Sequence, residues 1–233
     1  MMRKFGVVLA AILLSLPTAG QAQNDLGEIV VTAQRRSGDY YSDEQTVIGL
    51  RRDADSAVQA IWITSDSRAE SMRKSEIHAM LLAALQRAGA AGVQLVMGDF
   101  ELVTVTAANY RDLVFLPGNR PDTSKIALFV KAKLAGSTGN AQMRIDDFVK
   151  AVPSNGRALM EKQGNLTLTI INPDQYRDEV VKLVAENAKR YASYFGPEYG
   201  VEVGGLNEQL AWTQVSNTQV FLYIPYRFSI KPK

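Results

Sequence analysis

The chain of 233 residues contains no cysteine and a single histidine, His78. Without cysteine there is no disulfide, no thiolate nucleophile and no thiolate metal ligand. One histidine does not complete the usual zinc ligand sets, and a Ser-His-Asp triad would have to use His78 in the middle of a predicted helix. No G-x-S-x-G motif is present either. We therefore predict no catalytic residues, no metal and no cofactor, and we interpret His78 as structural.

The charges leave no excess of either sign. The chain has 26 basic and 24 acidic side chains, and two of the basic ones, Arg3 and Lys4, belong to its first four residues. A chain beginning at Gln23 therefore carries a formal net charge of zero. Nucleic-acid binding by counterion release requires a basic excess or a basic stripe. Nucleic acid is not an expected partner.

No apolar run reaches the roughly 20 residues that a membrane-spanning helix needs. The run at residues 5–17 is preceded by Arg3 and Lys4 and followed by Gly20, Gln21 and Ala22, a pattern typical of a Sec signal peptide. We predict that residues 1–22 are a signal peptide cleaved after Ala22, with an uncleaved membrane anchor as the alternative. The mature chain, residues 23–233, is then expected in the periplasm, without a transmembrane segment.

Residues 23–45 mix charges, glycine and serine and predict a flexible tail, whereas residues 46–233 show the periodicity of one folded domain. Strands and helices mix without regular βαβ alternation. This order predicts an α+β fold with a mainly antiparallel sheet packed by two or three helices. The expected strands are residues 47–51, 57–64, 93–106, 124–134, 166–171, 201–203, 208–214 and 219–230, and the expected helices are residues 67–88, a segment after residue 139, and residues 172–195.

Some of these elements carry finer expectations. Ser67 followed by Glu70 predicts a capping box at the start of the first helix. Residues 93–106 predict a long strand, bent near Gly98, that pairs as a hairpin with residues 124–134. In the latter strand the apolar residues share one face, and Lys131 and Lys133 point the other way.

The element order resembles that of the SIMPL-domain (DUF541) family of bacterial periplasmic proteins. Three segments carry the likeness: VIGLRRDADSAVQAIWITSDSRAE from Val47, VVKLVAENAKRYASYFG from Val180, and VFLYIPYRFSI from Val220. The family usually has proline before the aspartate that follows its first strand, where this chain has Ala54 before Asp55. The resemblance implies a non-enzymatic envelope protein without agreed catalytic residues. Because some members assemble into rings, it also implies a homo-oligomer.

A second resemblance is local. The segment after the signal peptide is similar to a TonB box, the peptide by which outer-membrane receptors contact TonB. It consists of Glu28, Ile29, Val30, Val31, Thr32 and Ala33. A β-branched peptide on a tether can add as a strand to an exposed sheet edge, which makes TonB or another periplasmic protein the expected partner. The alternative is that the segment is an edge strand of this protein's own sheet. A high β propensity is expected in both cases and does not distinguish them.

The chain is too short to be such a receptor itself. A 22-stranded barrel with about 10 residues per strand would use about 220 residues before any turn or plug. Residues 23–233 do not provide them.

The alternative to a binding function is an envelope hydrolase that uses acidic residues. Its carboxylates would lie in a cleft between the sheet and a helix. Its candidates are Asp53, Asp55 and Asp66. The adjacent pair Asp146 and Asp147 lacks EF-hand spacing, and we interpret it as solvent-facing.

Aromatic side chains concentrate near the C-terminus, either as a ligand or assembly surface or as cover for the end of the core. They are Tyr191, Tyr194, Phe195, Tyr199, Trp212, Phe221, Tyr223, Tyr226 and Phe228.

Overall fold

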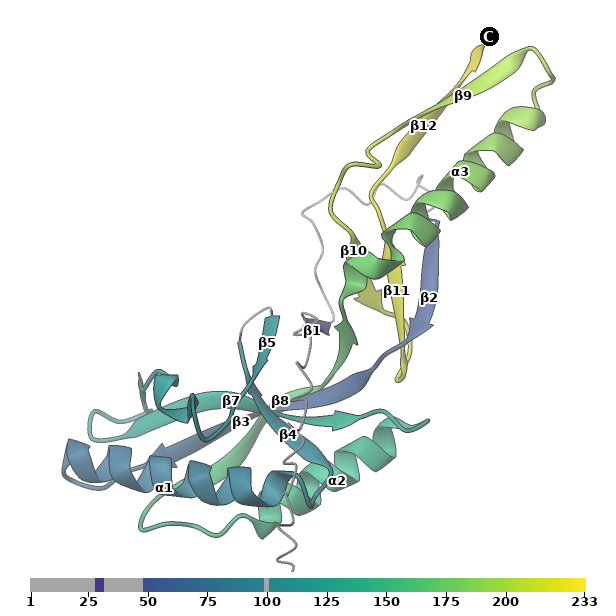
Figure 1. Cartoon of the computed structure of the whole chain (residues 1–233). Helices are drawn as coiled ribbons and strands as arrows, with labels where there is room; N and C mark the ends of the chain where they lie inside the picture. Colours follow the sequence, from purple (N-terminus) through teal and green to yellow (C-terminus); the bar gives the residue numbers. More distant parts are fainter. Residues whose placement is uncertain (1–27, 32–47, 99–100) are drawn as a thin grey trace, which may run out of the picture.

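The computed structural model of the chain describes residues 28–31, 48–98 and 101–233 (Figure 1). The expected signal peptide and the rest of the expected tail lie outside the described residues. The described part contains three α-helices, and its strands pair antiparallel. The predicted α+β class with a mainly antiparallel sheet is confirmed.

The longest pairing joins β3 (Ser56–Ser65) to β7 (Ser124–Lys133) over the full length of both strands. In β7 the residues Ile126, Leu128 and Val130 are buried and alternate with more exposed ones, the period-two pattern that gives an extended chain one core face. The other edge of β3 pairs with β8 (Leu159–Ile171), with a register shift between Val58 and Ala60. β8 begins seven residues before the strand expected at 166–171.

Four further pairings close these strands into a ring. β4 (Val93–Met97) pairs with β7 and with β5 (Glu101–Thr104), and β1 (Glu28–Val31) pairs with β5 and with β8. Since β3 pairs with both β7 and β8, the order β3-β8-β1-β5-β4-β7 returns to β3. The two-residue strand β6 (Leu116–Pro117) pairs with another part of β7. Within the ring, β1 is the strand that joins β5 to β8.

The prediction of one long strand over residues 93–106 is wrong. The chain reverses and forms a β4–β5 hairpin, and the expected pairing with residues 124–134 is made by β4 alone. The reversal includes Gly98, whose φ of 129° lies in the region that favours glycine. A Cβ at Gly98 would lie 1.9 Å from the carbonyl oxygen of Glu101. A sequence pattern that marks a bend at glycine does not distinguish it from a reversal.

Two helices, α1 (Glu70–Ala88) and α2 (Thr138–Ala151), cover one face of the sheet, as Figure 1 shows below β3 and β7. Between them and the sheet lies an apolar core with fully buried Ile61, Ile77 and Phe148. Ser137 caps α2, because its hydroxyl accepts the N–H of Asn140. The predicted capping box of α1 is wrong: Ala69 is the N-cap residue and provides no side-chain hydrogen bond.

The remaining elements form an arm that extends from this body (Figure 1). Its long helix, α3 (Arg177–Ser193), follows a 3-10 turn, η2 (Pro173–Tyr176), so the helix predicted over 172–195 is present with shifted ends. The strands of the arm are β2 (Gly49–Asp53), β11 (Gln219–Tyr223) and β10 (Ala211–Gln214) in one sheet, and β9 (Tyr199–Gly204) and β12 (Arg227–Pro232) in a two-stranded ribbon.

One apolar core connects the two parts, since it includes Ile61 of the body together with Val180 and Val220 of the arm. The expected arm strands are present with shifted ends. The one expected at 201–203 runs from Tyr199 to Gly204, the one expected at 208–214 begins only at Ala211, and the one expected at 219–230 is interrupted between β11 and β12. The one expected at 47–51 extends to Asp53, and Val47 lies outside the described residues. Among the described residues, no helix combines the length and the apolar character needed to cross a membrane.

Candidate functional site

Residues 28–31 of the TonB-box-like segment lie inside the sheet as β1. Four residues of β1 pair with β8, from Glu28 opposite Ile171 to Val31 opposite Leu168. On the other edge, Glu28 lies opposite Leu102 and Ile29 opposite Glu101 of β5. Thr32 and Ala33 lie outside the described residues. In the structure, residues 28–31 are a strand of the protein's own sheet, which is the second of the two interpretations. This strand has a neighbour on each side, whereas an edge strand was expected.

Glu28 is the one side chain of β1 that the structure describes, and it is buried. Only 6% of this side chain is exposed, and its carboxylate forms an ion pair with the Lys131 ammonium, which is 16% exposed. The hydroxyl of Thr169, a fully buried residue of β8, donates to Glu28 Oε1 at 2.5 Å. The three groups come from β1, β7 and β8, so one small polar contact connects three strands of the ring.

The surroundings of this ion pair are apolar. Val58, Val96 and Leu102 form a separate buried cluster with Phe129 packed against it. Leu102 lies opposite Glu28, and Val58 lies opposite Lys131 in the strand register. Removing two charges from water costs several kcal/mol per ion, which their mutual attraction and added hydrogen bonds must offset. Each charge is therefore tolerated here because the other one is present.

The role of Lys131 could not be read from the alternation of β7. Lys131 and Lys133 were both expected to point away from the core, and Lys133 is indeed exposed. Lys131 does lie on the face opposite Ile126, Leu128 and Val130, as expected, but its side chain is only 16% exposed because it meets Glu28 there. Alternation gives the face of a strand, but that face is buried here only because β1 and β5 cover it. One sequence feature could have indicated this partner. Glu28 carries the complementary charge, and its segment had two open interpretations, a free peptide or a strand of the sheet.

The structure does not gather the three candidate carboxylates of a hydrolase. Asp55 precedes β3 and Asp66 follows it, and at about 3.3 Å per residue the ten residues of β3 separate them by roughly 30 Å. Each carboxylate also has a structural partner: Asp53 accepts from Gln219 at 3.2 Å, Asp55 accepts the backbone N–H of Ile171 at 2.7 Å, and Asp66 forms ion pairs with Arg120 at 2.9 Å and Arg157 at 3.5 Å.

The remaining acidic candidates form no metal site. Asp146 accepts hydrogen bonds from Lys162 at 2.6 Å and Gln142 at 2.8 Å, and the hydrogen bond from Lys162 is the main reason that the pKa of Asp146 is lowered. Across residues 28–31, 48–98 and 101–233, no three His, Cys, Asp or Glu side chains come together as metal ligands would.

His78 lies between aromatic rings. Its ring makes edge contacts with Tyr110 at 5.4 Å and Phe115 at 5.1 Å between centroids. Burial lowers the pKa of His78, and the nearby charge of Arg111 lowers it further. The lowered pKa favours the neutral imidazole in this aromatic contact.

A second buried polar cluster, which the sequence pattern did not predict, lies at the end of β3. The carboxylate of Glu76 accepts hydrogen bonds from the hydroxyls of Ser65 at 2.6 Å and Ser67 at 2.8 Å. Ser67, predicted to form a capping box with Glu70, therefore donates to Glu76, which lies six residues beyond Glu70 inside α1. Gly156 packs against this carboxylate so closely that a Cβ there would lie 2.3 Å from Glu76 Oε1.

This cluster makes the stability of the protein dependent on pH. The hydrogen bond from Ser65 is the largest cause that lowers the pKa of Glu76 from its ordinary 4.5. A lowered folded-state pKa stabilises the fold above the unfolded-state value, and this contribution is lost as the pH falls through the folded-state value. We expect Glu76→Gln to be less stable than the wild type at pH 7, and the difference to shrink below about pH 4.5. Urea unfolding at several pH values measures it; a difference that is constant with pH would contradict the assignment.

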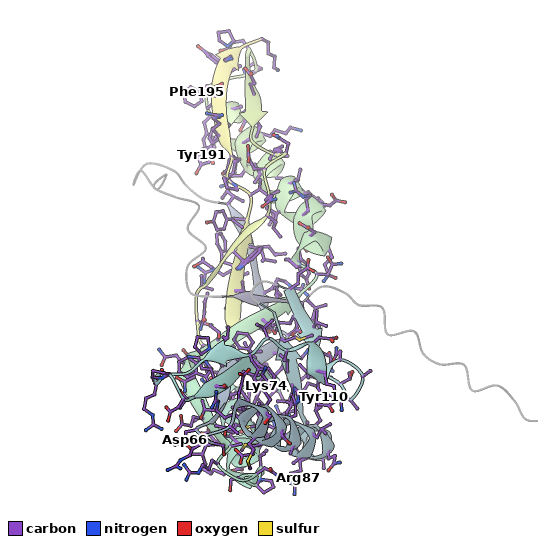
Figure 2. The ribbon with its side chains drawn as sticks, turned by 90° about the vertical axis from the view of Figure 1, so that its left-hand side faces the viewer. Asp66, Lys74, Arg87, Tyr110, Tyr191 and Phe195 are labelled. Carbon is purple, nitrogen blue, oxygen red and sulfur yellow. The ribbon has the colours of Figure 1, made fainter. Side chains whose placement is uncertain are left out.

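The C-terminal aromatic residues divide into two groups. Trp212 and Tyr223 are buried, and Trp212 belongs to the apolar core that connects the arm to the body. At the far end of the arm, marked by Tyr191 and Phe195 in Figure 2, Tyr191 stacks on Phe228 at 5.8 Å, while Tyr194 and Phe195 are 70% and 56% exposed. The interpretation as core cover holds for the first group only.

A search with models of protein families and a search among characterised proteins both find no match to this chain.

Proposed function

We propose that this chain is a non-enzymatic binding or scaffold protein of the bacterial cell envelope, exported by a signal peptide at residues 1–22. In this proposal its periplasmic partner is TonB, which engages residues 28–33 by strand addition. The proposal is supported by the likeness of residues 28–33 to a TonB box and by the extended conformation of Glu28–Val31. Strand addition requires a segment in this extended conformation.

Binding is favoured over catalysis by the state of the acidic residues. Asp53, Asp55 and Asp66 are each engaged by a neighbouring group, and the last is separated from the others by the length of β3. General acid–base catalysis needs such groups within hydrogen-bond reach of one reacting centre. The hydrolase alternative has no supporting observation among the described residues.

Any partner that takes β1 must first compete with the protein's own sheet. The apparent affinity for a partner is reduced by the fraction of molecules in which the segment is released. Because the Glu28–Lys131 ion pair is the only side-chain anchor of β1 described by the structure besides Thr169, weakening that pair is the most direct way to release the segment.

We expect Lys131→Met to bind the purified C-terminal domain of TonB at least about tenfold more tightly than the wild type, because 1.4 kcal/mol of lost anchoring corresponds to a tenfold larger released fraction. Isothermal titration calorimetry on residues 23–233 measures this affinity. Lys133→Met is the matched control, since Lys133 lies on the same face of the same strand but is exposed, and it should bind like the wild type.

Deleting residues 25–36 provides the second arm of this experiment. It should remove TonB binding, with circular dichroism reporting whether the remaining chain is folded. Unchanged affinity after the deletion, or absence of binding by the wild type and by Lys131→Met alike, would refute TonB as the partner.

A further inference from the structure

The space that β1 occupies has the properties of a peptide-binding site. On one side is the edge of β8 from Leu168 to Ile171, and on the other is the edge of β5 at Glu101 and Leu102. We name this space, between those two strand edges and next to Lys131 and Thr169, the β1 slot. Unpaired strand edges are templates for another extended chain. The described ring is complete only while a strand fills the slot.

The side chains of the slot specify what that strand must carry. If β1 leaves, the Lys131 ammonium and the fully buried Thr169 hydroxyl lose the carboxylate that binds both. Val58, Val96 and Leu102 beside them offer no polar group to Lys131, and the Thr169 hydroxyl keeps only the backbone carbonyl oxygen of Ser56, at 3.4 Å. A buried charge without a partner is strongly unfavourable. The slot therefore selects an extended segment with a carboxylate opposite Leu102, the position of Glu28.

We propose that the β1 slot is a strand-exchange site, which accepts the β1 segment of a second copy of this chain. Between Val31 and Gly49 lie the 17 residues 32–48, a length that spans up to about 55 Å when extended. A connection of this length allows β1 to leave its own body and enter a neighbouring one. The exchanged strand makes the same contacts as before, which is why swapping an identical element is a low-cost route to a dimer.

The absence of native cysteine makes this exchange measurable with disulfides. Ile29 lies opposite Glu101 in the strand register, and opposite residues of neighbouring strands have Cβ atoms close enough for a disulfide. We expect a mixture of full mature chains, one carrying Ile29→Cys and the other Glu101→Cys, to form a covalent heterodimer after oxidation. A size tag on one chain lets non-reducing electrophoresis distinguish it from homodimers.

The controls separate exchange from chance collision. Ile29→Cys mixed with Met143→Cys, a 56% exposed position on α2, should yield at least tenfold less heterodimer. Both substitutions in one chain, Ile29→Cys with Glu101→Cys, should form the internal disulfide and verify the register. An equal yield with Met143→Cys, or failure of the internal disulfide, would overturn the proposal.

Charge reversal tests the specificity of the slot. Adding Glu28→Lys to the Ile29→Cys chain should lower the heterodimer yield at least tenfold, and adding Lys131→Glu to the Glu101→Cys chain should restore it, because the ion pair then forms between the two copies with reversed signs. Loss without restoration would show that the yield depends on something other than this pair. No TonB is present in these mixtures, so the result is independent of the proposed function.

Discussion

Replacing Lys131 with methionine is expected to lower the free energy of unfolding by about 3 kcal/mol, because it leaves the Glu28 carboxylate buried without its counter-charge. Methionine keeps much of the apolar stem, so lost packing contributes little to the change. The Glu28 side chain is 6% exposed and retains only the hydrogen bond from Thr169. Urea denaturation of residues 23–233, followed by far-UV circular dichroism, measures this loss.

The double variant Glu28→Gln with Lys131→Met distinguishes an ion pair from a general packing defect. Removing both charges should recover at least half of the stability lost by Lys131→Met, since an unpaired buried charge no longer remains. Lys133→Met should change stability by less than about 0.5 kcal/mol, as is usual for an exposed site. If Lys131→Met and Lys133→Met destabilise equally, the burial of Lys131 within the ring is wrong.

Phe148→Ala is expected to destabilise the protein by about 4 kcal/mol, the usual cost of removing a buried aromatic side chain and leaving a cavity. Phe148 is 1% exposed and belongs to the core that joins α2 to the sheet. Thermal unfolding of residues 23–233 should show a lowered midpoint, with the transition remaining cooperative because the core extends continuously from the body into the arm.

Met143→Ala is the control within the same helix. Its side chain is 56% exposed, so its truncation should change stability by less than about 0.5 kcal/mol. A loss comparable to that of Phe148→Ala would mean that α2 presents a different face to the sheet. The comparison thus tests the orientation of α2 as well as its packing.

Much of the fold follows from periodicity. The spacing of Ile77, Leu81 and Ala84 predicts the buried face of α1, and all three are buried. The alternation of Ile126, Leu128 and Val130 predicts β7 to within one residue at its end. These elements were predictable because each has one face towards the core and one away from it, so local sequence carries the pattern.

Other features were not predictable in this way. Met143 and Phe148 are both apolar residues of the helix expected after residue 139, and only the position of the sheet shows that the first is exposed and the second buried. The reversal after Gly98 and the role of Ser67 as a donor to Glu76 both depend on contacts between segments. A pattern of single residues does not contain that information.

The sequence by itself determined the α+β class, the antiparallel character of the sheet and the faces of its most regular elements, because hydrophobic burial acts on each turn or strand separately. Only the tertiary structure decided that Glu28–Val31 closes a ring of strands and that its carboxylate meets Lys131 and Thr169 inside it. The physical reason is that a strand has two edges as well as two faces. The side chains of a strand determine which face is buried. The backbone N–H and C=O groups at its edges pair with whichever strands the fold places beside them, and the local sequence does not specify those strands.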